Sequence, residues 1–125
     1  MGKALDISRA ALAIFLAFVV LSACGQTTQQ SGLQIIAVVE LPVEARDTLR
    51  MIKTGGPFPY DRDGVIFKHY EKELPIHSKG YYREYTVKTP GLSHRGARRI
   101  VCGPLPECYY TADHYKSFKQ IQEQP

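Results

Sequence analysis

One carboxylate stands among many basic side chains in the stretch 79–99. The acid is Glu84, and the six bases are Lys79, Arg83, Lys88, Arg95, Arg98 and Arg99. Most charged residues on sheets are solvated or paired, so one interpretation is an ion pair between Glu84 and an arginine of a neighbouring strand. The other is a carboxylate that the guanidinium groups keep ionised and available as a general base.

A second group suited to proton transfer follows in the tripeptide Asp113-His114-Tyr115. A histidine can give or take a proton near neutral pH, although this tripeptide alone is weak support for catalysis. Together with Glu84 and the arginines it completes a set of base, acid and fixed positive charge, which suits a pentacoordinate phosphate. The set predicts phosphodiester cleavage.

The first element of the folded part is predicted to be a strand over 33–39, because this segment is apolar and β-branched. A helix should follow. Pro42 suits a first helical turn, and Leu41, Ala45, Leu49 and Ile52 recur at helical spacing. Gly55-Gly56-Pro57 should end this helix, and a surface loop up to Gly64 should follow it.

From Val65 onwards the pattern changes to short aromatic and β-branched runs separated by Gly, Pro, Ser and His. These predicted strands are 65–67, 81–88, 97–102, 108–111 and 117–121. One helix followed by hairpin-connected strands predicts an α+β fold, with the helix packed on one face of an antiparallel sheet. The other face would then be free to carry the residues that could act in catalysis.

The length and composition limit the architecture. The chain has 125 residues, of which 44% are hydrophobic and 22% charged, which fits one globular domain. A long disordered chain, a collagen-like repeat and a polytopic membrane protein are excluded. The net charge of +4 is a weak indication of an anionic partner.

The amino-terminal segment has the order of a signal peptide. Lys3 and Arg9 precede an apolar run of twelve residues, 10–21, which is too short to span a bilayer as a helix. Leu21-Ser22-Ala23-Cys24 resembles the bacterial lipobox, so residues 1–23 should be removed and Cys24 lipidated. The alternative is a soluble secreted protein cut near Ala23. Residues 24–32 are predicted to be a flexible tether, and 33–125 the folded domain.

The two remaining cysteines, Cys102 and Cys108, form an even pair in a protein expected to be exported, which predicts a disulfide. The residues between them can turn the chain and place the cysteines on facing strands. A zinc site that uses both cysteines and His114 is the alternative. It lacks the second ligand pair that would complete a tetrahedral shell.

Several motifs in unbroken order resemble the bacterial guanyl-specific ribonucleases, the family of barnase and the streptomycete guanyl-preferring enzymes. The resemblance covers about 41–121 and is greatest to the streptomycete branch. It is carried by Gly56–Tyr60, Glu71 with Leu74-Pro75, Gly80–Val87, Arg98-Arg99-Ile100 and Tyr109–Tyr115. It implies the microbial ribonuclease fold and cleavage of RNA after guanosine.

The resemblance also implies roles for single residues. Glu84 would take the proton from the ribose 2'-oxygen, and His114 would protonate the leaving 5'-oxygen. Arg99, with Arg95 in support, would hold the phosphate through the planar donor fork of guanidinium. A 2',3'-cyclic phosphate forms first and is then hydrolysed, and neither a metal nor another cofactor is required.

Recognition of guanine would use the segment Phe67-Lys68-His69-Tyr70-Glu71. Backbone amides of Lys68 to Glu71 would meet O6, and the Glu71 carboxylate would accept from N1–H and the exocyclic amine, so that adenine is rejected. Phe67 and Tyr115 would stack on the base. The family usually has Asn-Arg where His69-Tyr70 stands, and this departure could relax the preference for guanine.

The expected partner is RNA, bound by a monomer that meets the membrane only through its lipid anchor. The resemblance also implies a barstar-like proteinaceous inhibitor. Two other functions remain open at this point: a ribonuclease-like module that binds RNA or protein without cutting, and a toxin paired with an inhibitor. We expect the protein at the periplasm or cell surface, or secreted, because the predicted disulfide forms in oxidising compartments.

Overall fold

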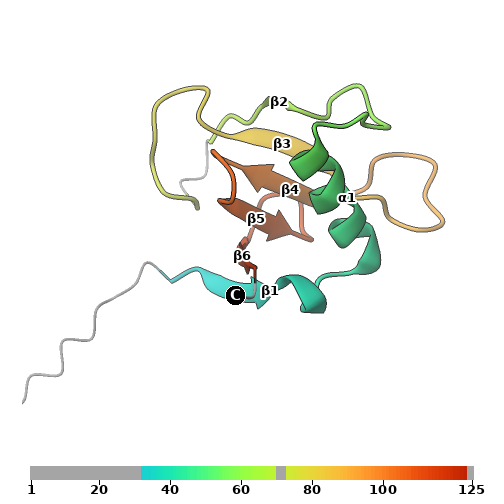
Figure 1. The fold of residues 1–125 in the computed structure, drawn as a ribbon, viewed down its shortest axis with the longest axis horizontal. Coiled ribbons are helices and arrows are strands. Elements are labelled where there is room, and N and C mark those ends of the chain that lie inside the picture. Colours follow the sequence, from blue (N-terminus) through green and yellow to red (C-terminus); the bar gives the residue numbers. More distant parts are fainter. Residues whose placement is uncertain (1–31, 70–72, 124–125) are drawn as a thin grey trace, which may run out of the picture.

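The fold consists of one α-helix and a six-stranded sheet (Figure 1). The structure, a computed structural model, describes residues 32–69 and 73–123. Its elements are β1 (Gln34–Ala37), the 3-10 helix η2 (Val38–Glu40), α1 (Val43–Thr54), β2 (Val65–Ile66), β3 (Arg83–Thr86), β4 (Arg99–Cys102), β5 (Cys108–Thr111) and β6 (Lys119–Gln122). The strand order is β1-β6-β5-β4-β3-β2.

Helix α1 begins and ends where the sequence predicts. Pro42 is its N-cap, and Gly55 ends it in the left-handed conformation at φ 83°, which costs glycine no side-chain clash. Its buried residues recur every three or four positions and form the face that packs on the sheet. They are Ala45, Thr48, Leu49 and Ile52. The predicted amphipathic helix is confirmed.

The predicted α+β fold is confirmed, with one departure in the sheet. The pairs β2–β3, β3–β4, β4–β5 and β5–β6 are antiparallel, whereas β1 pairs with β6 in parallel, with Ile36 opposite Ile121. Tight hairpins force neighbouring strands to be antiparallel, but β1 and β6 are the first and last strands and no hairpin joins them. Their direction could not be read from local turn signals.

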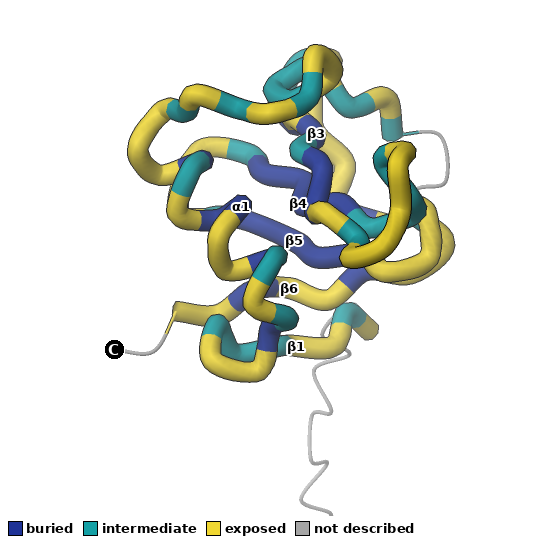
Figure 2. Tube along the Cα trace, turned by 90° about the vertical axis from the view of Figure 1, so that its right-hand side faces the viewer, coloured by how far each residue is buried: buried dark blue, intermediate teal, exposed yellow. Residues whose placement is uncertain are grey.

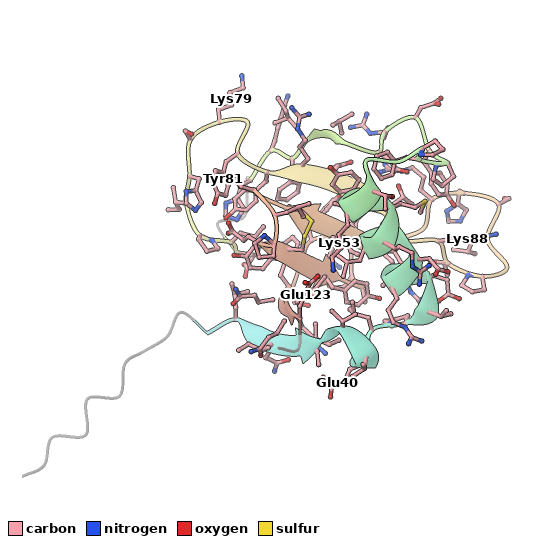
Figure 3. The ribbon with its side chains drawn as sticks, viewed as in Figure 1. Glu40, Lys53, Lys79, Tyr81, Lys88 and Glu123 are labelled. Atoms are coloured by element: carbon pink, nitrogen blue, oxygen red, sulfur yellow. A yellow bond between two sulfur atoms is a disulfide. The ribbon has the colours of Figure 1, made fainter. Side chains whose placement is uncertain are left out.

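Five of the six predicted strands are shorter than expected, and 108–111 alone matches its predicted range. Within the predicted strand 33–39, only Gln34–Ala37 pair as a strand, and the chain then turns into η2. The Glu40 carboxylate accepts a hydrogen bond from the Ala37 amide at 3.0 Å, which closes that turn near the lower edge of the molecule (Figure 3). Likewise, strand β3 occupies only the centre of the predicted range 81–88.

The sheet separates two buried clusters, because successive side chains of a strand point to opposite faces. Strand β4 illustrates this: Ile100 and Cys102 pack with α1, whereas Val101 packs on the other side with Tyr109. The buried segments run through β3, β4 and β5 (Figure 2). We call the side packed by α1 the helix face. The opposite side, which carries Glu84, Thr86, Arg99, Val101, Tyr109 and Thr111, is the site face.

The predicted disulfide joins Cys102 and Cys108, which are register partners on β4 and β5 with Cα atoms 4.1 Å apart. Both sulfurs are therefore occupied, and the zinc alternative is wrong. No group of three His, Cys, Asp or Glu residues suited to a metal ion occurs within 32–69 and 73–123.

Beyond the sheet, an ion pair between Lys53 and Glu123 ties the end of α1 to the segment after β6 (Figure 3). In the described part of the chain, no helix is both long and apolar enough to cross a membrane.

Candidate active site

Strands β3 and β4 bring Glu84 and Arg99 to the same side of the sheet. Glu84 is opposite Val101, and Thr86 is opposite Arg99, so the acid and the arginine lie on the site face two residues apart in register. Both are buried, with 7% of Glu84 and 3% of Arg99 exposed. A charged pair of residues with so little water around it needs specific partners.

The carboxylate of Glu84 is held by three side chains. Arg95 Nη2 donates to Oε1 at 3.3 Å, and Arg62 Nε lies 3.9 Å from the same oxygen. The hydroxyl of Tyr115 donates to Oε2 at 2.9 Å. Glu84 is therefore ion-paired as expected, but its partners Arg62 and Arg95 lie in loops and not on a neighbouring strand.

Arg99 is fixed mainly by backbone carbonyls. Its Nη1 donates to the oxygens of Gly96 at 2.9 Å and Arg98 at 2.8 Å. Its Nε is buried and, among the side-chain nitrogens and oxygens of the described residues, is the only such atom without a partner. A buried guanidinium with an unused donor is a strong site for an anionic oxygen, since the donor otherwise loses its hydration without compensation.

The turn after β5 holds His114 and Tyr115 in the left-handed region, at φ 55° and 71°. Such values are uncommon for residues other than glycine and cost about 1–3 kcal/mol each. The turn is secured by the His114 amide, which donates to the Ala97 carbonyl at 3.0 Å, and by the Tyr115 amide, which donates to Thr111 Oγ1 at 3.1 Å. The strain thus coincides with the two residues predicted to act on the substrate.

Asp113 shapes this turn through its carboxylate. Oδ1 accepts from the Thr111 hydroxyl and from the Ser117 amide, each at 2.9 Å, and Oδ2 accepts from the Ser117 hydroxyl at 2.5 Å. The hydrogen bond from the Ser117 hydroxyl is the main cause that lowers the pKa of Asp113. Burial opposes it, and the bonds from the Ser117 amide and the Thr111 hydroxyl add to the lowering. Asp113 therefore positions the backbone at His114.

Tyr115 contacts both the Glu84 carboxylate and the ring of Phe67, which is predicted to bind the base. Its ring centroid is 4.9 Å from that of Phe67 and 4.8 Å from that of His114. Burial, followed by the charge of Glu84, raises the pKa of the Tyr115 hydroxyl to about 12, so this hydroxyl stays a donor at neutral pH. Rings at this separation touch each other. A base between Phe67 and Tyr115 therefore requires one ring to turn away.

The segment that follows β2 is anchored at both ends of its described part. The Phe67 amide donates to the Tyr82 carbonyl at 2.9 Å, and the Leu74 amide donates to His69 Nε2 at 2.6 Å. That nitrogen must be unprotonated to accept, and burial lowers the pKa of His69 against the opposing charge of Glu73. Lys68 is exposed. Tyr70 and Glu71 lie outside the described residues.

Three further residues complete the arrangement and were missed from the sequence. Arg62 approaches Glu84 from the turn before β2, as given above. Thr86 Oγ1 accepts from Arg95 Nε at 2.9 Å, and Asp63 Oδ1 accepts from the Thr86 amide at 2.7 Å. The Asp63-Gly64 turn signal was visible in the sequence. It marked a loop, but nothing in it indicated that the loop folds back on β3.

Known proteins that are similar to this chain are ribonucleases. A family model described as ribonuclease matches residues 24–122. The chain is 60% identical over 82 residues to guanyl-specific ribonuclease Sa3 of Kitasatospora aureofaciens, a match that covers 65% of the chain and 58% of that relative. It is 50% identical over 96 residues to guanyl-specific ribonuclease St of Saccharopolyspora erythraea, covering 77% of the chain and 92% of the relative.

Among solved structures, ribonuclease Sa2 with guanosine-2'-cyclophosphate superposes with a TM-score of 0.70 and 45% identity. The superposition covers 74% of this chain and 100% of that one. The family model spans most of the chain, and the second relative is matched over nearly its whole length, so the chain belongs to the ribonuclease family.

Proposed function

We propose that the chain is a guanyl-preferring endoribonuclease that cleaves single-stranded RNA on the 3' side of guanosine. Two similar proteins are named guanyl-specific ribonucleases, and a third of the same fold was solved with a guanosine cyclophosphate. These names support the same specificity here. The match covers little more than half of the first relative, so the activity needs a test on this chain itself.

The observation that carries the proposal is the environment of Glu84. A buried carboxylate lies beside Arg95 and Arg62, on the same face as buried Arg99 with its unpaired Nε. The contacts with these positively charged arginines hold the carboxylate in a fixed position, and a carboxylate can accept a proton. The same charges attract a phosphate, which places the proton acceptor beside the group that reacts.

In the first step, Glu84 takes the proton of the ribose 2'-hydroxyl, and the 2'-oxygen attacks phosphorus. The bond from phosphorus to the 5'-oxygen breaks, and His114 gives its proton to that oxygen. Arg99 and Arg95 stabilise the charge that develops on the phosphate oxygens. The products are a 2',3'-cyclic phosphate and a free 5'-hydroxyl.

In the second step the roles reverse. His114, now neutral, takes a proton from water as the water oxygen attacks phosphorus. Glu84, now protonated, returns its proton to the 2'-oxygen as the bond from that oxygen to phosphorus breaks. The enzyme ends in its starting protonation state, with a 3'-phosphate as product. The reaction written in this way uses no metal ion or cofactor.

Preference for guanine is assigned to the segment 67–71, with stacking by Phe67 and Tyr115. The anchor from Leu74 to His69 supports this assignment, because it fixes a residue that stands where the family usually has asparagine. The roles of Lys68, Tyr70 and Glu71 stay predictions. Substrate entry requires Tyr115 to leave both Phe67 and Glu84, since its present contacts occupy the space between them.

The test is cleavage of the dinucleoside phosphates GpC, ApC and UpC in the presence of EDTA, with 2',3'-cyclic products followed by chromatography. We expect GpC to be cleaved at least about 10²-fold faster than the other two, the scale of discrimination when a recognition group is left unpaired. Equal cleavage of all three would retain the nuclease and reject the guanine preference. A folded protein that cleaves none of them would indicate a binding module.

Export and anchoring are a separate part of the proposal, because residues 1–31 lie outside the described residues. We assign residues 1–23 to a signal peptide, Cys24 to lipidation and 24–32 to a tether. Mass spectrometry of the protein from its bacterial host should find a diacylglycerol-modified amino terminus at Cys24, and Cys24→Ser should release the protein from the membrane fraction. The barstar-like inhibitor, the toxin role and the monomeric state stay predictions.

A further inference from the structure

A cavity of about 420 Å³ opens beside the predicted guanine-binding segment. One wall is formed by the end of β2 and the residues after it, among them Ile66, Phe67 and Lys68. The other wall is the loop that leads into β3, with Ile76, His77 and Lys79. Neither Glu84, Arg95, Arg99 nor His114 lines it, so the cavity is distinct from the catalytic centre.

The cavity contains a flat aromatic platform. The rings of His77 and Tyr81 are stacked, with centroids 3.7 Å apart and an angle of 13° between their planes. The Tyr81 hydroxyl donates to Glu107 Oε2 at 2.5 Å, which holds the tyrosine ring in place. A pre-positioned aromatic surface binds a nucleobase by stacking at little entropic cost, and such stacking depends weakly on base identity.

The charges around the platform suit an anion. Lys68 and Lys79 are exposed at the cavity, and no Asp or Glu occurs among its described lining residues. Ile66 and Ile76 add exposed apolar surface, with 42% and 76% of each exposed. A base packed on apolar and aromatic groups, with its phosphate near lysines, satisfies all of these features.

The cavity lies in line with the predicted RNA path. Phe67 belongs both to the cavity wall and to the pair with Tyr115, which reaches Glu84. Tyr81 lies in the loop just before β3, three residues before Glu84 in the sequence. Figure 3 shows Lys79 and Tyr81 on the side of the molecule away from Lys88. Phe67 therefore connects the predicted guanine site with this cavity.

We infer that the cavity is a subsite for the nucleotide joined to the 5' side of the guanosine. The inference rests on the proposed function, because it takes the direction of the strand from the catalytic roles of Glu84 and His114. The nucleotide on the 3' side leaves with the 5'-oxygen that His114 protonates, so it lies beyond the catalytic groups. The base on the 5' side stacks on the His77–Tyr81 platform, and its phosphate lies near Lys79.

The test compares kcat/KM for GpC, ApGpC and GpCpA with the wild-type protein. The extra 5' nucleotide should raise kcat/KM about fivefold or more over GpC, the lower end of what one stacked base contributes. The double variant His77→Ala/Lys79→Gln should remove this advantage and cleave GpC at the wild-type rate. Lys88→Gln removes one exposed charge elsewhere and should keep the advantage. Thermal unfolding of each variant checks that it is folded.

Equal kcat/KM of wild-type protein for ApGpC and GpC would overturn the inference, and this result does not depend on the folding of any variant. It would also be overturned if the double variant kept the advantage of ApGpC, or if it lost rate on GpCpA instead. Absence of cleavage of GpC itself would overturn the proposed function and this subsite with it. The two failures are therefore distinguishable.

Discussion

The two faces of the sheet differ in how their side chains are satisfied. The helix face packs Ala45, Leu49 and Ile52 of α1 on Ile100 and the disulfide, and its contacts are almost wholly apolar. The site face holds buried charges and an unpaired guanidinium nitrogen, and the turn after β5 adds two non-glycine residues with positive φ. Apolar packing is non-directional and stabilises the fold, whereas burial of charged groups on the site face carries a desolvation penalty. We therefore expect the helix face to determine stability and the site face to determine activity.

The largest expected effect is in the turn beside the site face, at His114. His114→Ala and His114→Gly both remove the imidazole, so kcat/KM for GpC should fall about 10²–10⁴-fold. Because His114 has φ 55°, the glycine variant should be more stable than the alanine variant by about 1 kcal/mol. Denaturant unfolding measures the difference. Equal stability of the two variants would mean that this turn stores no strain.

On the helix face, Leu49→Ala should have the opposite outcome. Leu49 is 3% exposed, and its truncation should lower the free energy of unfolding by about 2–5 kcal/mol. At a temperature where the variant is folded, kcat/KM should stay within about twofold of wild type. The control is Val43→Ala, since Val43 is 54% exposed on the same helix and should change stability by less than about 0.5 kcal/mol. A large activity loss in folded Leu49→Ala would contradict the separation of the faces.

Asp113→Ala should affect both stability and activity, because Asp113 holds the strained turn. Loss of its bonds to Thr111 and Ser117 should reduce stability by about 1 kcal/mol and kcat/KM by up to about 10²-fold through misplacement of His114. The lowered pKa means that this stabilisation is complete above about pH 4 and is lost as pH falls through the folded value. The difference in free energy of unfolding between wild type and Asp113→Ala should therefore become smaller as the pH falls. A constant difference from pH 7 to pH 2 would contradict the role of Asp113 in holding the turn.

The smallest effect is expected at His69, at the edge of the site face. His69→Ala removes the acceptor for the Leu74 amide and should reduce the preference for GpC over ApC about fivefold, the value of one hydrogen bond. His69→Asn supplies an amide oxygen as acceptor and should preserve the preference for GpC. Because the pKa of His69 is lowered in the folded protein, the neutral ring stabilises the fold above about pH 6.5. This stabilisation declines as the pH falls through the folded pKa. His69→Asn should not show this decline in unfolding experiments at pH 5 and 7.5.

The helix face was largely predictable from the sequence. The spacing of Ala45, Leu49 and Ile52 set the buried side of α1, and Gly55 set its end. The pairing of Cys102 with Cys108 followed from their even number and a short turn between them. The parallel pairing of β1 with β6 did not follow, because it joins residues at the two ends of the domain and no local signal specifies it.

For the site face, the identities of the candidate residues were predictable from the sequence, but most of the contacts that position them were not. Glu84, Arg95 and Arg99 stood out as an acid among bases. Register brought Glu84 and Arg99 to one face, and Arg95 reaches Glu84 from the loop between β3 and β4. Three contacts depend on how the loops fold over the sheet. They are the bond from Tyr115 to Glu84, the approach of Arg62 to Glu84 and the bond from the Leu74 amide to His69. Such contacts join residues far apart in the chain, and the family pattern does not contain His69.

The most direct test of the account is the pH dependence of GpC transphosphorylation by the wild-type protein and by Glu84→Gln. With an ionised Glu84 as base and a protonated His114 as acid, the wild-type rate should be bell-shaped in pH. Glu84→Gln should lose about 10²–10⁴-fold in rate and the acidic limb of the profile, while its unfolding midpoint stays near that of wild type. A folded Glu84→Gln protein with the wild-type rate and the same bell-shaped profile would contradict the assignment of Glu84 as the base.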